Sequence, residues 1–291
     1  KNRNSINSPL LKGEGEIGNP KAEIRGILLI KMIVRTIVRY TLLFLISISI
    51  NAYATSLQDN VGSSQVSILT DFSIEDSLGI TAHEVIDNYL EAIGGRDLFA
   101  EVVDRTTIMR GTAMGQNVTL LVKQKVPAKL YQEIKVGEMR QNVYFDGDRG
   151  MMVMGDNNIE IEKKELEKLK FEATMNLLLD PETYGLKISL AGIEQVDSID
   201  CYVVKMVLPS GLRWQQYYSV ETGFKLKEIK ELHTQQGLFE QESLYSDYRN
   251  VDGLKFPFKI VQNMGMQKLE LKVSSIKLNS GISDDVFVIP E

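Results

Sequence analysis

A run of short β-rich segments between Ile199 and Ile260 constrains the fold more than any other part of the sequence. Glycine-bearing turns at 209–211, 221–223 and 252–253 separate these segments. β-Branched and aromatic residues between such turns predict consecutive antiparallel strands joined by tight hairpins. Strands joined in this way form a large curved sheet. What covers the concave face of that sheet then becomes the functional question.

The same alternation of apolar and polar residues occurs on both sides of this region. It predicts further strands, which are 118–125, 129–136, 139–145, 149–154, 186–190 and 269–273. No linker or change of composition divides residues 79–291, so we expect one domain there. The predicted fold class is α+β and mostly β: a large curved antiparallel sheet, an incomplete half-barrel, with helices covering its concave face.

A helix is predicted at 81–95, before the first strand. Thr81 and Glu84 have the spacing of a capping box, in which each side chain binds the backbone amide of the other residue. The apolar residues that follow lie on one stripe of a helix, and they are Val85, Ile86, Tyr89, Leu90 and Ile93. Gly94 and Gly95 end the helix. The stripe needs an apolar partner, and the sheet is the only one large enough.

A second helix is predicted at 163–179, where the strands are interrupted. Its first half is highly charged, and its second half is apolar on nearly all sides before Asp180 and Pro181 stop it. Such a helix must be buried, or it must cover an apolar surface. We expect it to act as a lid.

The first 54 residues have the features of an exported protein. Residues 1–31 are predicted to be an upstream extension, and Met32 is a plausible start. Residues 32–54 combine basic residues, a short apolar run and a small-residue cleavage pattern, which predict a signal peptide cleaved after Ala54. A transmembrane anchor is the alternative, but the uninterrupted apolar run is only about half of the ~20 residues that a span needs. Residues 55–78 are predicted to be a flexible leader.

The negative net charge argues against electrostatic attraction to anionic lipid headgroups or to nucleic acid. The 291-residue chain has a formal net charge of −6. Residues 1–54 hold 8 Lys and Arg and 3 Asp and Glu, so the mature chain would be near −11. Nucleic-acid binders need a basic surface to neutralise phosphates. We therefore expect no nucleic-acid partner. The predicted signal peptide places the mature protein in the periplasm, where we expect a monomer.

The sequence contains few residues suited to catalysis or metal binding. His83 and His233 are its only histidines, and neither has a second histidine or cysteine at ligand spacing. The single cysteine, Cys201, lies within a predicted strand, where a small buried side chain is the ordinary interpretation. We expect no metal, no cofactor and no enzymatic activity. A hydrolase using His83 or His233 is the enzyme hypothesis to be tested.

What remains is a large set of apolar residues at strand and lid positions. Each of them is explained by ordinary core packing, but the set exceeds what one small helix can cover. A curved sheet with an apolar concave face suits a lipid or acyl chain. The predicted cavity-lining residues are Val118, Leu120, Val122, Phe171, Leu177, Tyr202, Met206, Trp214, Tyr218, Phe256 and Phe258.

Several segments, taken in order, resemble the LolA-like family of outer-membrane lipoprotein-sorting proteins. The matching segments span roughly residues 79–289, and they are 81–96, 143–150, 201–205, 217–228 and 245–260. The run Tyr245-Ser-Asp-Tyr-Arg-Asn-Val-Asp-Gly-Leu-Lys-Phe-Pro-Phe-Lys-Ile260 is the most distinctive.

The resemblance implies an open β-barrel whose apolar cavity carries lipoprotein acyl chains or other lipids across the periplasm. Helix 163–179 would be its lid, and helix 81–95 would pack in or across the cavity. An inner- or outer-membrane delivery partner is also implied. The family's lid-closing arginine has no local motif here, and Arg110 is a candidate. The alternative function is a non-enzymatic envelope sensor or interaction module on the same scaffold.

Overall fold

A computed structural model describes residues 77–291, except 114, 235–236 and 265–266, and the side chains of 233–237 and 264–267. The predicted extension, the signal peptide and nearly all of the leader therefore lie outside the described residues. Within the described residues, no helix is both long enough and apolar enough to cross a membrane.

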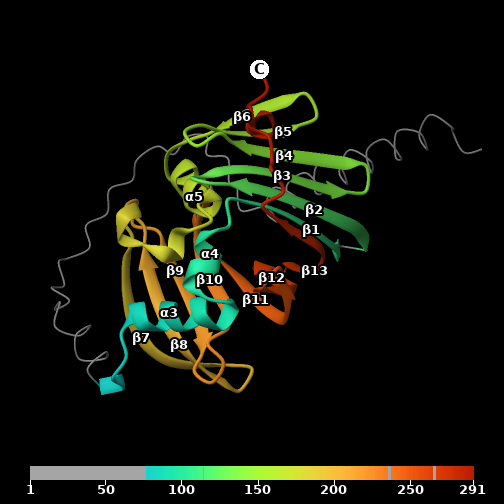
Figure 1. Ribbon diagram of the computed structural model, residues 1–291. Helices are drawn as coiled ribbons and strands as arrows, with labels where there is room; N and C mark the ends of the chain where they lie inside the picture. Colours follow the sequence, from blue (N-terminus) through green and yellow to red (C-terminus); the bar gives the residue numbers. More distant parts are fainter. Residues whose placement is uncertain (1–76, 114, 235–236, 265–266) are drawn as a thin grey trace, which may run out of the picture. The chain divides into compact units, whose positions relative to one another are not determined.

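Within the part of the chain that the structure describes, thirteen strands form one antiparallel sheet that does not close into a barrel (Figure 1). This confirms the predicted fold class. The strands are β1 (Asp104–Ala113), β2 (Gln116–Lys125), β3 (Lys129–Val136), β4 (Met139–Phe145), β5 (Gly150–Met154), β6 (Asn157–Ile161), β7 (Lys187–Val196), β8 (Ile199–Val207), β9 (Arg213–Ser219), β10 (Lys225–Thr234), β11 (Gly237–Val251), β12 (Leu254–Met264) and β13 (Gln267–Leu278).

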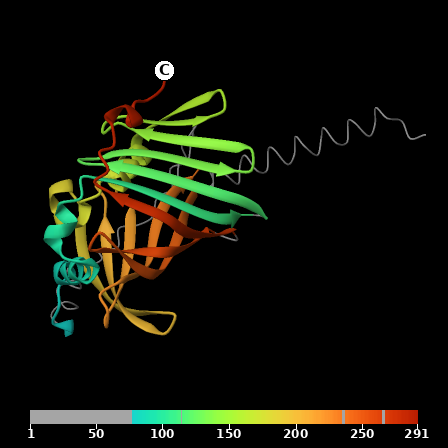
Figure 2. The same cartoon turned by 45° about the vertical axis from the view of Figure 1, so that its right-hand side comes forward.

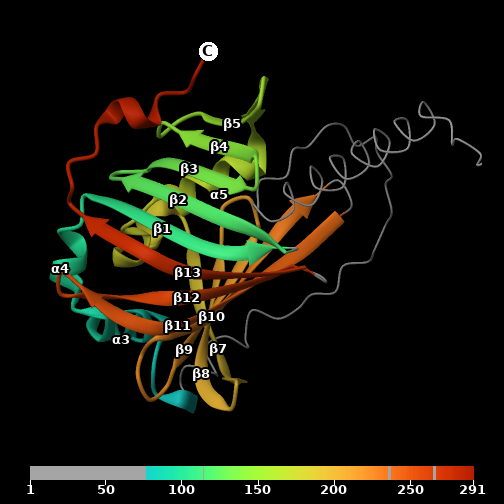
Figure 3. The same ribbon diagram turned by 90° about the vertical axis from the view of Figure 1, so that its right-hand side faces the viewer.

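The strand order divides the sheet into two meanders. It runs β6-β5-β4-β3-β2-β1-β13-β12-β11-β10-β9-β8-β7, so β6 and β7 are the two edges. The meanders meet where β1 pairs with β13, and Figures 2 and 3 show these two strands side by side. The chain therefore passes from one edge strand to the other through the single connection between β6 and β7.

Helix α3 (Ala82–Ile93) begins as its sequence predicts. Thr81 and Glu84 form both halves of the capping box, and the backbone N–H of Thr81 donates to Glu84 Oε2 at 2.8 Å. The apolar stripe is buried except for Tyr89. Tyr89 is partly buried and packs against the apolar cluster that the stripe forms with the sheet. A short helix that was not predicted, α4 (Arg96–Ala100), follows at once.

The connection between β6 and β7 differs from the single helix predicted at 163–179. Helix α5 (Lys163–Ala173) ends at Thr174, whose backbone is extended with ψ of 100°. The Thr174 hydroxyl donates to the Lys170 carbonyl at 2.8 Å, and this bond competes with continuation of the helix. Two 3₁₀ turns follow, η1 (Leu177–Leu179) and η2 (Glu182–Tyr184). The predicted lid is therefore a helix joined to a pair of turns.

Helices pack tightly on both ends of the sheet. A Cβ atom on Gly150 of β5 would lie 2.9 Å from Leu169 Cδ2 and 3.2 Å from Leu166 Cδ1, so α5 rests directly on the β5–β6 end. Helix α3 shares a buried apolar cluster with β7, β8 and β9 at the other end. The opposite face of β8 buries Cys201 in a separate cluster with Val203 and Tyr217. Burial raises the pKa of the Cys201 thiol, as expected for a structural cysteine.

The pairing of β1 with β13 generates a stability prediction. A methyl group on Gly111 would lie 2.0 Å from the carbonyl oxygen of Glu270 in the neighbouring strand. Because that oxygen belongs to the backbone, Gly111→Ala would force the two strands apart. We expect a loss of about 3 kcal/mol, at the upper end of the usual cost of overpacking, measured by urea denaturation. Thr112→Ala, on the exposed face of the same strand, is the control. An equal, small effect of both changes would contradict close approach at this position.

Candidate functional site

A cavity of 350 Å³ lies between the sheet and its helical cover. Strands β1, β2 and β9–β13 line one side of it, and α3, α4, α5 and η1 line the other. Its volume falls within the range of about 300–1,000 Å³ that is typical of small-molecule sites. Because both meanders contribute, the site exists only when β1 and β13 are paired.

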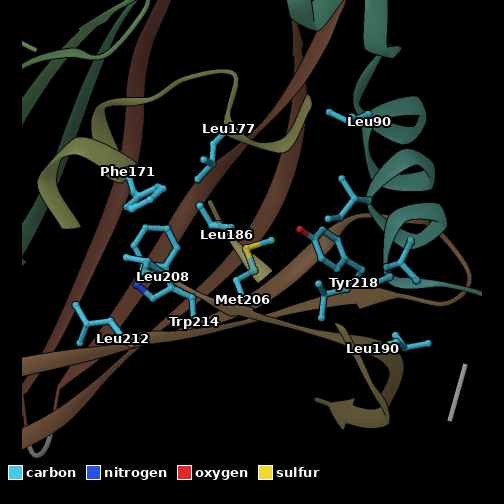
Figure 4. Close-up of a cluster of buried hydrophobic side chains, with 14 of the residues drawn as sticks. Leu90, Phe171, Leu177, Leu186, Leu190, Met206, Leu208, Leu212, Trp214 and Tyr218 are labelled. Atoms are coloured by element: carbon cyan, nitrogen blue, oxygen red, sulfur yellow. The ribbon is translucent and has the colours of Figure 1, made fainter. Parts of the chain in front are cut away.

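Aromatic and aliphatic side chains form much of the cavity wall. The rings of Phe171 and Trp214 meet edge to face, with 6.3 Å between their centroids. Figure 4 shows both rings in one buried cluster with Leu177 of η1. Tyr89 of α3 also lines the cavity, and its ring lies 5.2 Å from that of Tyr218.

Five of the eleven predicted residues line this cavity: Val122, Phe171, Leu177, Trp214 and Phe256. They come from β2, α5, η1, β9 and β12, so the fold brings together positions that are far apart in the sequence.

The other six predicted residues lie elsewhere in the domain. Val118 and Leu120 are buried on the same face of β2 as Val122, but nearer the N-terminal end of the strand and outside the cavity lining. Met206 and Tyr218 are buried in the cluster beneath α3 (Figure 4). Tyr202 lines a separate 410 Å³ groove beside α3, and Phe258 packs against the Arg249 guanidinium, 4.8 Å from its ring centroid.

A buried carboxylate is the main polar feature of the cavity. Glu228 accepts hydrogen bonds from Lys225 at 3.1 Å, Gln216 at 2.6 Å and the Tyr245 hydroxyl at 3.2 Å, and it pairs with Lys230 at 3.1 Å. Burial alone would raise the pKa of Glu228, but the two lysines hold it well below its usual range. Glu228 is therefore a satisfied anion in a wall that combines apolar and polar side chains.

The Glu228 cluster also connects the sheet to the lid. Lys230 pairs with Glu172 of α5 at 3.4 Å, and Glu172 lies 3.9 Å from Lys168 on the same helix. Burial would lower the pKa of Lys230, but Glu228 and Glu172 raise it above its usual value. These charge pairs link strand β10 to α5 across the cavity.

Arg105, rather than Arg110, is the arginine of the cavity. Arg110 is exposed, and the register of β1 places it on the opposite face from Arg105. The Arg105 Nη2 donates to Gln124 Oε1 at 2.5 Å, and Gln124 Nε2 donates to the Glu172 carbonyl at 2.9 Å. Its guanidinium lies 5.6 Å from the centroid of the Phe256 ring. Arg105 is thus linked to the end of α5 indirectly, through the side chain of Gln124.

Sequence reasoning missed the polar half of this lining. Tyr245 and Tyr248 belong to the most distinctive sequence run, yet they were not predicted to line the cavity. Both do so, and burial raises the pKa of each phenol. For β1, the available signal was the short hairpin between β1 and β2, whose register places Arg105 and Thr107 on the face of Val122. No pattern in the sequence pairs Glu172 with β10.

Of the two histidines in the enzyme hypothesis, His83 lies outside the cavity. His83 is exposed in the first turn of α3, where its Nε2 is 2.6 Å from Glu182 Oε1. It borders a 560 Å³ surface groove between α3 and η1–η2 that is lined largely by charged residues. His233 belongs to β10, and its side chain is not among those described. In the described part of the chain, no group of three or more His, Cys, Asp or Glu residues could hold a metal ion.

The described residues thus form an open, curved antiparallel sheet with a cavity beneath a helical cover. No protein-family model matches the chain, and no curated protein matches it. Among solved structures, it is similar to a LolA superfamily protein from Nitrosomonas europaea. The TM-score is 0.50 and the identity is 16%, over 72% of this chain and 98% of that chain.

A DUF1329 family protein from Desulfovibrio piger is also similar, with a TM-score of 0.48 and 14% identity over 71% of this chain and 97% of that chain. The likeness to the LolA superfamily protein confirms the LolA-like fold that the sequence motifs predicted. It is a likeness of fold, so the ligand has to be argued from the residues of this chain.

The environment of Glu228 generates a second stability prediction. Glu228→Gln keeps the shape of the side chain but leaves Lys225 without a carboxylate. Removing one partner of a buried pair costs about 3–5 kcal/mol, and we expect a loss in this range at pH 7, measured by urea denaturation. Because the folded pKa lies below the value of about 4.3 for free glutamate, this stabilisation is lost as the pH falls below that value.

The control is Glu270→Gln, which removes an exposed carboxylate 2.9 Å from Lys268 and should change stability little. The difference between the wild type and Glu228→Gln should shrink as the pH is lowered below about 4. A difference that stays constant down to acid pH would show that the charge of Glu228 is not responsible.

Proposed function

We propose that this protein is a non-enzymatic carrier that holds lipid or lipoprotein acyl chains in the 350 Å³ cavity and serves outer-membrane lipoprotein sorting. The observation that supports the proposal is the cavity itself, which is walled by apolar side chains of the sheet and roofed by α5 and η1. Apolar surface contributes roughly 25 cal/mol per Å² when it is removed from water. An acyl chain along this wall would gain that contribution.

The roof is suited to entry and release. Its apolar side chains pack on the sheet, and its polar contacts with the sheet include Lys230–Glu172 and the Arg105–Gln124 contact with the end of α5. A few polar contacts of this kind can be exchanged when a cargo enters or leaves. Val122, Phe171, Leu177, Trp214 and Phe256 are the predicted residues that we propose contact the cargo.

The remaining parts of the proposal concern location and partners. We propose that residues 32–54 direct export and are removed after Ala54, and that residues 55–78 form a leader. Residues 79–291 would then act in the periplasm as a monomer. A delivery partner at the inner or outer membrane would receive the cargo, and neither a cofactor nor nucleic acid would take part.

Filling the cavity tests the proposal. Thr107 lines the cavity from β1, and Thr112 is exposed on the opposite face of the same strand. Thr107→Trp should weaken binding of a fluorescent fatty acid at least about tenfold, a change of ~1.4 kcal/mol, because the indole occupies the space of the acyl chain. Thr112→Trp should bind as the wild type does. Fluorescence titration of the purified proteins measures both.

Lipid mass spectrometry of the protein purified natively from the periplasm completes the test. We expect acyl-bearing molecules in the wild type and fewer in Thr107→Trp. A wild-type protein without lipid that also takes up no fluorescent fatty acid would exclude the carrier. A stable protein partner found in place of lipid would favour the sensor or interaction module. A reaction abolished by substituting His83 and His233 together would favour the enzyme.

A further inference from the structure

One cation in the cavity lacks a carboxylate partner. Arg105 is half-buried, and its polar contact among the described residues is the amide oxygen of Gln124. Its Nε is buried and has no hydrogen-bond acceptor. Burial lowers the pKa of the guanidinium below its ordinary value. A buried cation without an anion is costly, so such groups are normally paired.

The other cations of the lining are already satisfied or exposed. Lys225 pairs with Glu228, and Lys230 pairs with Glu228 and with Glu172. Lys255 is exposed, and it donates to the Ala92 carbonyl at 3.2 Å. Within the described residues, Arg105 is therefore the one half-buried cavity cation that is free to pair with an incoming anion.

A second buried donor of the cavity also lacks an acceptor. The indole Nε1 of Trp214 is buried and unpaired, and Trp214 lines the same cavity. Both unsatisfied groups of the described lining, Arg105 Nε and Trp214 Nε1, are N–H donors, and each lacks an acceptor within reach. A guanidinium is well shaped to bind a carboxylate or a phosphate through two parallel hydrogen bonds.

We infer that the cargo is an amphiphile with an anionic head group, whose carboxylate or phosphate pairs with Arg105 inside the cavity while its acyl chain lies along the apolar wall. This inference rests on the proposed carrier function and narrows its cargo to a charged lipid. The apolar ring of Phe256, beneath the guanidinium, marks where the head group ends and the chain begins.

Three probes that share one acyl chain test the inference on the full-length protein after delipidation. Oleate carries a carboxylate, 1-oleoyl lysophosphatidate carries a phosphate, and monooleoylglycerol has no charge. Displacement of N-phenyl-1-naphthylamine, an uncharged dye that fluoresces in apolar cavities, measures the affinity for each. We expect the better anionic probe to bind the wild type at least about tenfold more tightly than monooleoylglycerol, since hydrogen bonds to charged groups are the strong ones.

Tighter binding of oleate assigns a fatty-acid carboxylate, and tighter binding of lysophosphatidate assigns a phospholipid phosphate; either result supports the inference. Arg105→Gln should abolish the preference for a charged head group, measured within the same variant as the ratio of its affinities for the anionic probe and for monooleoylglycerol. Arg110→Gln, on the exposed face of the same strand, should retain the preference. Circular dichroism of each variant shows whether it is folded, and Arg105→Met replaces a variant that is not.

Two results overturn the inference while leaving the carrier intact. One is equal affinity of the wild type for charged and neutral probes, which needs no variant. The other is a preference that survives in Arg105→Gln. Failure of the wild type to bind the dye and all three probes would instead remove the proposed function itself, so the two failures are distinguishable.

Discussion

The structure depends on one topological constraint, which is that β6 and β7 are opposite edges of the same open sheet yet are consecutive in the chain. The segment between them must travel from one edge to the other. Its apolar residues, including Leu169, Phe171 and Leu177, gain by crossing the side of the sheet where they are buried. A roof over the cavity therefore follows from the order of the strands. The roof lies between the two meanders in the sequence because β6 ends one meander and β7 begins the other.

The interior that this connection encloses is not uniformly apolar. Glu228 and its lysines place a compensated charge cluster in the wall, and Glu172 extends the cluster to α5. Each member of this cluster has a partner, whereas Arg105 has only the Gln124 amide. Burying charges is costly without good pairing. The paired lysines therefore belong to the structural part of the wall. Arg105, which has no carboxylate partner, belongs to the part suited to a ligand.

Local sequence signals predicted the helices and strands well, but they predicted less well where a helix ends and how the strands align. The capping box at Thr81 is a short-range pattern, and it was confirmed together with the buried stripe of α3. The helix at 163–179 was predicted too long, because apolar residues on all sides look the same whether a helix continues or gives way to 3₁₀ turns. The sequence offers Arg110 as a candidate for the lid arginine, but the pairing of β1 with β2 puts Arg105 on the same face as Val122 and Arg110 on the opposite face. Most of the cavity lining lies on strands whose register no single segment reveals.

The sequence by itself determined the mostly β class, the antiparallel hairpins, the start of α3 and the motifs of a LolA-like fold, because these depend on residues that are close along the chain. Only the tertiary structure decided which apolar residues face a cavity and which fill a core. Val122 and Val118 have the same pattern, but only Val122 meets the space beneath α5. The pairing of Lys230 with Glu172 and the lack of a carboxylate at Arg105 depend on strand register and on the path of the lid. Both are set by contacts between residues that are far apart in the chain.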